Sequence, residues 1–112
     1  MFRLTRNGDV ARLVLDRPEA RNAIPMAGWS ELARLVGMAA DARLLVLAGA
    51  EGAFCAGADL SDFAALCEDE AARVRFREGM RAALDALRHL PIPTVALIDG
   101  PCYGAGVALA MA

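Results

Sequence analysis

The stretch TVALIDGPCYGAGVALAMA, residues 94–112, contains a strand pattern, a turn and the start of a helix. The apolar run Thr94–Asp99 is typical of a short buried strand, and the glycines from Gly100 to Gly106 favour a turn. Small side chains at such a turn let a ligand reach main-chain N–H groups, which are unpaired where a helix begins. The stretch therefore predicts a strand-to-helix junction that can hold an anion, although no acid or base lies on it beyond Gly100.

Another junction of the same kind lies earlier in the chain. RLLVLAG (43–49) is a continuous apolar run ending in glycine, which predicts a strand buried on both faces. AEGAFCAGADL (50–60) follows it as a loop of small residues. If the two junctions converge, their N–H groups form an oxyanion hole, in which losing one donor typically costs about 10²–10³ in rate.

The rest of the chain alternates strand and helix patterns. Residues 1–6 and 10–16 predict a hairpin around Asn7-Gly8-Asp9. Pro25 is expected in the first turn of a helix that runs to about Ala40. A long helix is expected from about Glu68 to Leu90, ended by the prolines of 91–93. This alternation favours an α/β layout with parallel strands.

Spacing of three and four residues gives each helix an apolar face. These faces are Trp29, Leu32, Ala33, Val36 and Ala40 in the first helix, and Phe76, Met80, Ala83, Leu84 and Leu87 in the second. The last helix pattern ends without glycine, proline or a cap. We therefore expect the chain to be the N-terminal part of a longer protein.

Composition excludes several classes of protein. The 112 residues are 57% hydrophobic and 23% charged, which is typical of one globular domain. No apolar run approaches the roughly 18 residues of a membrane span, and the charged start MFRLTRNGDV lacks a signal-peptide core. All 12 basic residues are scattered arginines and the net charge is −2, so neither nucleic acid nor a membrane is an expected partner. A cytoplasmic enzyme is the expectation.

The cysteines and the histidine give no metal site. Cys55, Cys67 and Cys102 have a spacing that fits neither zinc ligands nor a disulfide framework, and they are expected to be buried apolar residues. The single His89 is expected to satisfy carbonyl groups at the end of the long helix. The glycine pattern is not a dinucleotide fingerprint or a P-loop, and no G-x-S-x-G elbow is present.

Three pieces of the chain match one family in order and spacing. VLDRPEARNAI (14–24), LLVLAGAEGAFCAGADL (44–60) and LPIPTVALIDGPCYGAGVALAMA (90–112) resemble the N-terminal part of the crotonase family, also called enoyl-CoA hydratase/isomerase. The resemblance implies a crotonase-like (ClpP/crotonase) α/β fold of repeated ββα units, incomplete at the C-terminus. Residues 1–112 would be the N-terminal portion of a single core domain.

The resemblance also implies the ligand and its site. The ligand is an acyl-CoA thioester, no separate cofactor or metal is needed because coenzyme A is part of the substrate, and the full-length protein forms a homotrimer or hexamer. The N–H groups of Ala58 and Ala105 match the two oxyanion donors that hold the thioester oxygen as an enolate forms. The expected CoA contacts are Ala56, Gly57, Asp59, Leu60, Arg21 and Gly104.

Several residues near this site are compatible with two different roles. Arg17 and Arg21 are candidate phosphate partners or residues of a solvated loop. Asp59 can cap the loop, and Tyr103 can pack or touch substrate. Glu68, Asp69 and Glu70 fit a helix start, although in some relatives an acid from this region reaches the acyl chain. Gly52 stands where many relatives have a lysine, so the chain lacks that contact.

Departures from the family pattern point to the reaction. Ala108, preceded by Val107, stands where the hydratase pattern has glutamate, and the second catalytic acid of the family lies outside these residues. Double-bond isomerisation of an enoyl-CoA is therefore favoured, with hydration as the alternative. A non-catalytic acyl-CoA-binding or assembly subunit is a further alternative. Residues 1–112 alone are expected to be inactive.

Overall fold

Four strands form one sheet in the computed structural model, which describes residues 1–112. The strands are β1 (Phe2–Asn7), β2 (Val10–Leu15), β3 (Leu44–Gly49) and β4 (Thr94–Leu97), and they lie in the order β1-β2-β3-β4. β1 and β2 form an antiparallel hairpin, whereas β3 is parallel to both β2 and β4. The predicted hairpin and parallel strands are confirmed.

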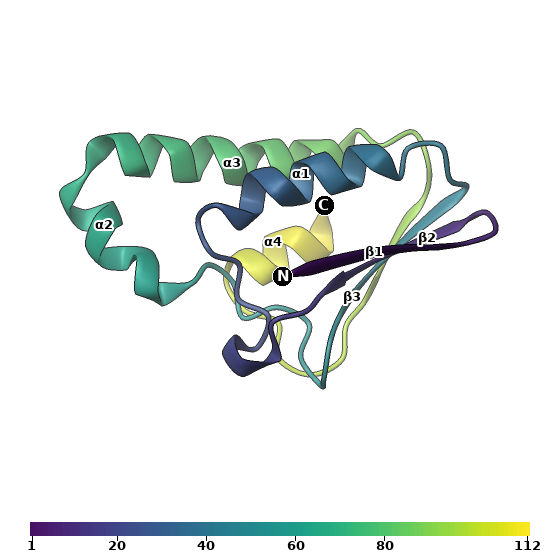
Figure 1. Cartoon of the computed structure of the whole chain (residues 1–112), viewed down its shortest axis with the longest axis horizontal. Helices are drawn as coiled ribbons and strands as arrows, with labels where there is room; N and C mark the ends of the chain where they lie inside the picture. Colours follow the sequence, from purple (N-terminus) through teal and green to yellow (C-terminus); the bar gives the residue numbers. More distant parts are fainter.

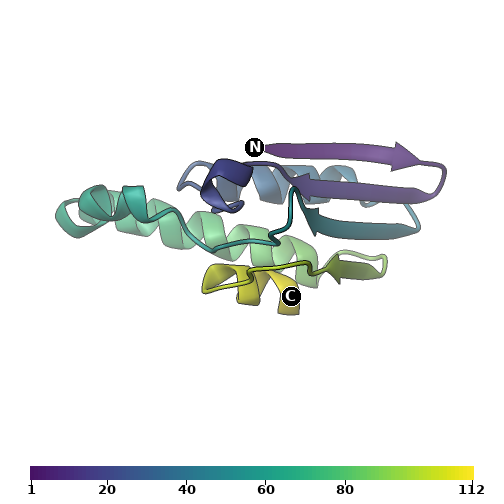
Figure 2. The same ribbon diagram turned by 90° about the horizontal axis from the view of Figure 1, so that it is seen from below.

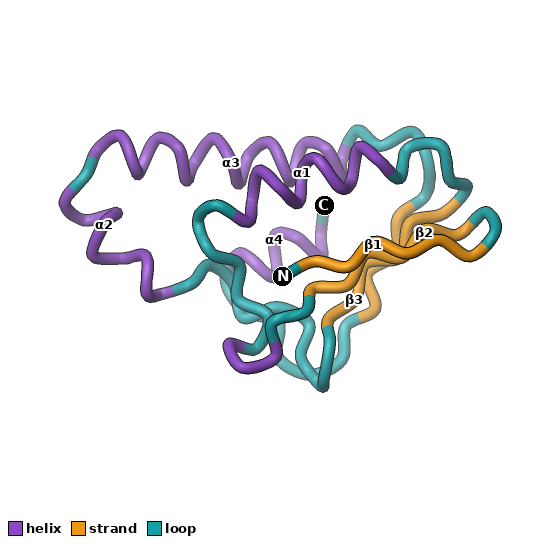
Figure 3. The backbone as a smooth tube through the Cα atoms, in the orientation of Figure 1, coloured by secondary structure: helices purple, strands orange, loops and turns teal.

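The register brings the ends of the parallel strands to one edge of the sheet. Leu15 at the end of β2 is opposite Gly49 of β3, and Ala48 is opposite Leu97 at the end of β4. Figure 3 shows the loops that follow these strands gathered at that end. Ligands of open parallel sheets bind at this edge, outside the carboxyl ends of the strands.

The helices are α1 (Gly28–Met38), α2 (Phe63–Glu68), α3 (Glu70–Arg88) and α4 (Ala105–Met111), with short 3-10 turns η1 (Pro18–Ala20) and η2 (Leu60–Asp62). Helices α1, α3 and α4 form a second layer on one face of the sheet, whereas α2 lies at the end of α3 away from the strands (Figure 1). The buried cluster between the layers contains Trp29 and Leu32 of α1, Leu13 and Leu45 of the sheet, and Leu109 of α4. α1 and α3 also pack against each other.

The predicted helix bounds need two corrections. α1 begins at Gly28 rather than at Pro25, which lies in the preceding turn and accepts a hydrogen bond from the Gly28 N–H (2.8 Å). The long helix α3 begins at Glu70 rather than at about Glu68, because Asp69 has an extended φ of −122° and its carboxylate accepts from the Ala71 N–H (2.9 Å). A side chain that bonds a nearby backbone N–H starts a new helix there. α2 was not predicted.

Burial of the strands also differs from the prediction. In β3 only Leu45, Leu47 and Ala48 are buried, because helices cover one face of the sheet and leave the other open. β4 was predicted to be buried, but three of its four residues are exposed. β4 is the last strand of the sheet (Figure 2), and no strand pairs with its outer edge.

Candidate functional site

Three loops are joined to one another where they leave β2, β3 and β4. Ile24 and Ala58 form an isolated parallel bridge, and Cys55 and Cys102 form another. These bridges extend the strand order beyond the sheet itself. The two glycine-rich junctions that the sequence singled out are therefore direct neighbours.

The first junction is the segment of residues 54–60 after β3, in which Ala58 lies between two residues whose backbone groups are hydrogen-bonded. The Gly57 carbonyl accepts from the Ile24 N–H (2.8 Å), and the Asp59 N–H donates to the Ile24 carbonyl (3.0 Å). Gly57 has φ of +103°, a conformation that side-chain-bearing residues rarely adopt. The N–H of Ala58, which lies between these bonded groups, has no acceptor in the chain.

The second junction is the segment of residues 103–109 after β4, in which α4 begins at Ala105. Gly104, with φ of +52° and ψ of −122°, precedes the first helical residue. The next N–H groups are bonded, from Gly106 to the Tyr103 carbonyl (2.8 Å) and from Val107 to the Gly104 carbonyl (3.0 Å). The Ala105 N–H, like that of Ala58, has no acceptor in the chain.

Glycine allows the two junctions to touch. A Cβ placed on Gly57 would lie 2.9 Å from the Tyr103 carbonyl oxygen and 3.3 Å from the Ala105 nitrogen. A Cβ on Gly106 would overlap the Cys55 carbonyl oxygen. The free N–H groups therefore lie at the contact between the two segments, and both alanines are partly exposed. Two such donors can stabilise negative charge on an oxygen between them.

Asp59 anchors the first junction. One oxygen of its carboxylate accepts from the Ser61 N–H (2.9 Å) and hydroxyl (2.8 Å), and the other accepts from Arg17 Nη1 (2.6 Å). The Ser61 N–H, followed by the Arg17 guanidinium, lowers the pKa of Asp59 to about 2. The capping role considered for Asp59 is what the structure shows. Asp59 also stays, by resemblance, a predicted CoA contact.

The two arginines of the 17–24 loop differ in whether their guanidinium groups have partners within the chain. Arg17 pairs with Asp59 and also donates to the Ala23 carbonyl (3.2 Å), so its charge is already matched inside the chain. Arg21 is exposed, and its side chain makes no hydrogen bond or ion pair. Of the two predicted phosphate partners, only Arg21 has a side chain available to a ligand.

Asn22 is a structural residue of the site that the sequence reasoning missed. It is fully buried, has φ of +59°, and its side-chain amide donates to the carbonyls of Ala50 (2.9 Å) and Ala53 (3.0 Å). Its side-chain oxygen accepts from the Arg17 N–H (2.9 Å). Asn22 therefore joins the loop after β2 to the loop after β3. Asparagine tolerates positive φ, and this tendency was the available signal.

The other predicted residues lie around these junctions. The Ala56 N–H donates to the Arg21 carbonyl (3.0 Å), Leu60 is exposed, and Gly104 is exposed beside Tyr103. Ala108 is exposed on α4, which carries no carboxylate. His89 Nδ1 lies 2.9 Å from the Asp85 carbonyl oxygen, in agreement with the predicted helix-end role.

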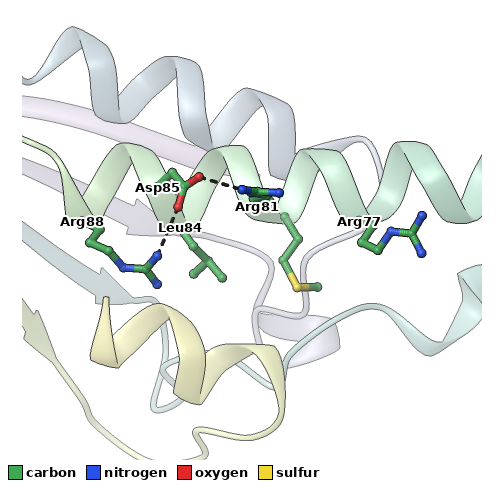
Figure 4. Close-up of a pocket in the computed structure, with 6 residues that line it drawn as sticks. Arg77, Arg81, Leu84, Asp85 and Arg88 are labelled. Carbon is green, nitrogen blue, oxygen red and sulfur yellow. Dashed lines mark hydrogen bonds and ion pairs between the residues drawn. The ribbon is translucent and has the colours of Figure 1, made fainter.

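None of the hollows on the structure is lined by Ala58 or Ala105. One hollow lies along α3, where Leu84 and Arg88 point toward α4 (Figure 4). Asp85 lies within ion-pair distance of Arg81 (3.6 Å) and Arg88 (3.2 Å), so it balances part of the positive charge there. The arginines of this hollow are exposed, and the Asp85 carboxylate is already paired with two of them.

The structure contains neither a metal-binding cluster nor a membrane-spanning helix. No three His, Cys, Asp or Glu side chains are grouped so that they could hold a metal ion. None of the helices combines the length and apolar composition that crossing a bilayer requires.

The fold and the paired junctions agree with what is known of other proteins. The family model for enoyl-CoA hydratase/isomerase matches residues 5–112, and the chain belongs to this family. An enoyl-CoA isomerase/hydratase of Mycosarcoma maydis is 38% identical over 92% of the chain and 41% of its own length. Human mitochondrial enoyl-CoA hydratase domain-containing protein 2 is 34% identical over 92% of the chain and 36% of its own length.

Solved structures of the same family superpose closely on the chain. An enoyl-CoA hydratase/isomerase family protein of Hyphomonas neptunium matches with a TM-score of 0.92 and 38% identity, over 98% of this chain and 44% of that one. An enoyl-CoA hydratase/carnithine racemase of Magnetospirillum magneticum matches with a TM-score of 0.90 and 34% identity, over 97% and 42%. The chain thus has a crotonase-type fold and spans less than half the length of these proteins.

Proposed function

We propose that the protein containing this chain binds an acyl-CoA thioester and stabilises its enolate with the N–H groups of Ala58 and Ala105. The observation that carries the proposal is that both groups lack an acceptor and lie at the contact between the two junctions. A negative thioester oxygen would accept both hydrogen bonds. Such donors stabilise the transition state because their orientation is set before the reaction.

The CoA part of the substrate would lie along the first junction. The expected contacts are Ala56, Gly57, Asp59 and Leu60, with Arg21 and Gly104 nearby. Arg21 can pair with a phosphate because its guanidinium has no partner in the chain. In this proposal coenzyme A enters as part of the substrate, and no separate cofactor or metal takes part.

The reaction that we favour is movement of a double bond in an enoyl-CoA. Hydration by two acids would need a carboxylate at position 108, which is alanine. Asp59 cannot readily replace it, since its carboxylate is held by Ser61 and Arg17. The proton is therefore moved by one acid outside residues 1–112. Hydration is the alternative reaction, because the family name covers both.

The test uses the intact protein and two substrates. A 3-enoyl-CoA should be converted to the conjugated 2-enoyl-CoA, whereas crotonyl-CoA should be hydrated more slowly by the factor of about 10²–10⁴ that one general acid or base contributes. Rapid hydration of crotonyl-CoA would contradict the preference for isomerisation.

A non-catalytic acyl-CoA-binding or assembly subunit is the alternative from another class, since the second junction carries no acid. Exchange of the C2 protons of an acyl-CoA in D₂O separates it from an enzyme, because exchange requires an enolate. Binding without exchange would support the non-catalytic subunit. We also propose a cytoplasmic homotrimer or hexamer, which light scattering and cell fractionation test.

A further inference from the structure

Two of the three cysteines lie side by side where the junctions meet. Cys55 and Cys102 are partners in an isolated parallel bridge. The Cys55 N–H donates to the Pro101 carbonyl (3.2 Å), and the Tyr103 N–H donates to the Cys55 carbonyl (3.0 Å), so hydrogen bonds on both sides of Cys102 fix the pairing.

This pairing has the dimensions of a disulfide. Neighbouring strands are about 4.7–4.9 Å apart, and residues paired across them direct their side chains to the same face. A disulfide forms where Cα atoms are about 4.4–6.8 Å apart. Both cysteines are free thiols in this structure. The sequence predicted three buried cysteines, but only Cys55 is buried: Cys102 is partly exposed and Cys67 is exposed. Cys67 lies on α2 and takes part in neither bridge.

We propose that Cys55 and Cys102 form a reversible redox site, at which hydrogen peroxide joins the two junctions through an intramolecular disulfide. Cys102, which is partly exposed, reacts first: its sulfur takes one oxygen from peroxide, giving a sulfenic acid and water. The Cys55 sulfur then attacks the Cys102 sulfur, loses its proton and releases the second water. The two sulfurs are oxidised by one electron each, and peroxide is reduced to two waters.

The surroundings of the pair set this order. Cys55 is fully buried, and burial raises the pKa of its thiol to about 11, with a smaller contribution from nearby Cys102. Burial keeps peroxide away from the Cys55 sulfur, whereas Cys102 is partly exposed. Cys55 is therefore the resolving cysteine rather than the one that meets peroxide. The raised pKa makes the second step the slower one, because the attacking Cys55 sulfur must lose its proton.

The cross-link would act on the first junction. Cys55 Sγ accepts a hydrogen bond from the Gly57 N–H (3.4 Å), one residue before Ala58. A bond to Cys102 redirects this sulfur and weakens that contact. We expect the Ala58 N–H to shift and enolate stabilisation to weaken, a consequence that rests on the proposed function.

Peptide mapping of the intact native protein tests the disulfide. After peroxide treatment and alkylation, we expect one pair of peptides joined through Cys55 and Cys102, two hydrogens lighter than the reduced pair and released by dithiothreitol. Cys67→Ser should still give this pair, and Cys102→Ser should abolish it. In urea, Cys55–Cys67 should become the main link, because loop closure favours the shorter loop.

Two results would overturn the proposal. One is a native protein in which Cys67 supplies the intramolecular link. The other is oxidation of Cys102 to sulfinic acid with no linked pair. Either result would show that the bridge does not bring the sulfurs within bonding reach.

Activity measurements test the consequence separately. Cross-linked Cys67→Ser protein should exchange C2 protons of an acyl-CoA about tenfold more slowly or worse, since the oxyanion donors are displaced, and dithiothreitol should restore the rate. An unchanged rate in fully cross-linked protein refutes the coupling to Ala58. If the reduced protein shows no exchange at all, the proposed function fails, while the peptide map still decides the disulfide.

Discussion

Gly57 is the residue on which the contact between the two junctions depends. Its φ of +103° is strained for any side chain, and a Cβ would lie 2.9 Å from the Tyr103 carbonyl oxygen. Gly8, in the hairpin turn, also has positive φ (+63°), but a Cβ there would meet nothing within 4 Å. The two glycines therefore separate backbone strain from steric contact.

We expect Gly57→Ala to destabilise the protein more than Gly8→Ala. The positive φ alone costs roughly 1–2 kcal/mol in each variant, and at Gly57 the junctions must also separate. Urea denaturation measures both costs, and acyl-CoA turnover should fall only in Gly57→Ala. Equal losses of stability would contradict the close contact.

Ala105 allows one backbone donor to be removed with little other change. It is the first residue of α4, where proline is well tolerated, and its N–H makes no hydrogen bond in the chain. We expect Ala105→Pro to lower kcat/KM for acyl-CoA turnover about 10²–10³-fold, since proline has no N–H.

Ala105→Gly keeps the donor and should stay within a few-fold of the wild-type rate. Thermal denaturation of both variants checks that α4 still forms. A proline variant with wild-type kcat/KM would exclude Ala105 as an oxyanion donor.

At the scale of elements, the loop after β2 is held to η2 by one ion pair. Arg17 and Asp59 are mostly covered, with side chains 29% and 14% exposed. The pair of Arg6 with Asp41 is nearly as short, at 2.8 Å against 2.6 Å, but Asp41 is 78% exposed. The Arg6 hydrogen bond and charge lower the pKa of Asp41 as well. Solvent screening makes exposed pairs weak.

The hydrogen bonds of Asp59 with the Ser61 N–H and with Arg17 predict a particular dependence of stability on pH. The pKa of Asp59 is lowered to about 2 in the folded protein, from about 3.9 in an unfolded chain. Its stabilisation is therefore complete above about pH 4 and is lost as the pH falls through about 2. The stability difference between wild type and Asp59→Asn should follow this course in urea denaturation.

Asp41→Asn is the matched control. It should change the free energy of unfolding less than Asp59→Asn does, and its effect should disappear at high salt. A pH-independent difference for Asp59→Asn would show that the charge of Asp59 contributes nothing.

Helix and strand positions were largely predictable, but the links between loops were not. The hairpin, the parallel strands, the long helix and the helix after Gly104 all follow from local patterns. The boundary between α2 and α3 at Asp69 and the hydrogen bonds from Asn22 to two carbonyls each depend on which partner one side chain meets in the folded chain. Sequence spacing does not contain that information.

At the scale of the whole molecule, one side of the chain is unprotected. β4 has an open edge, and five large apolar side chains on or near β4 and α4 are more than 40% exposed. They are Val95, Leu97, Ile98, Val107 and Met111. Open strand edges and apolar patches promote association.

The 112-residue chain, purified alone, should therefore self-associate or unfold in part. Light scattering and binding of a hydrophobic dye measure this directly. Leu97→Lys should reduce association, because a charge on an edge strand opposes pairing. A monomeric chain with a cooperative melt would contradict the expectation.

The sequence by itself determined the order of the strands and of the helices other than α2, the two glycine-rich junctions and the family, because these depend on local patterns and motif spacing. The tertiary structure decided how the junctions meet: glycine at 57 and 106 lets backbone touch backbone, and two N–H groups are left without acceptors. It also decided that Arg17 is matched by Asp59 and that Cys55 lies beside Cys102. The physical reason is that contacts between distant segments depend on strand register and chain packing, which local sequence does not specify.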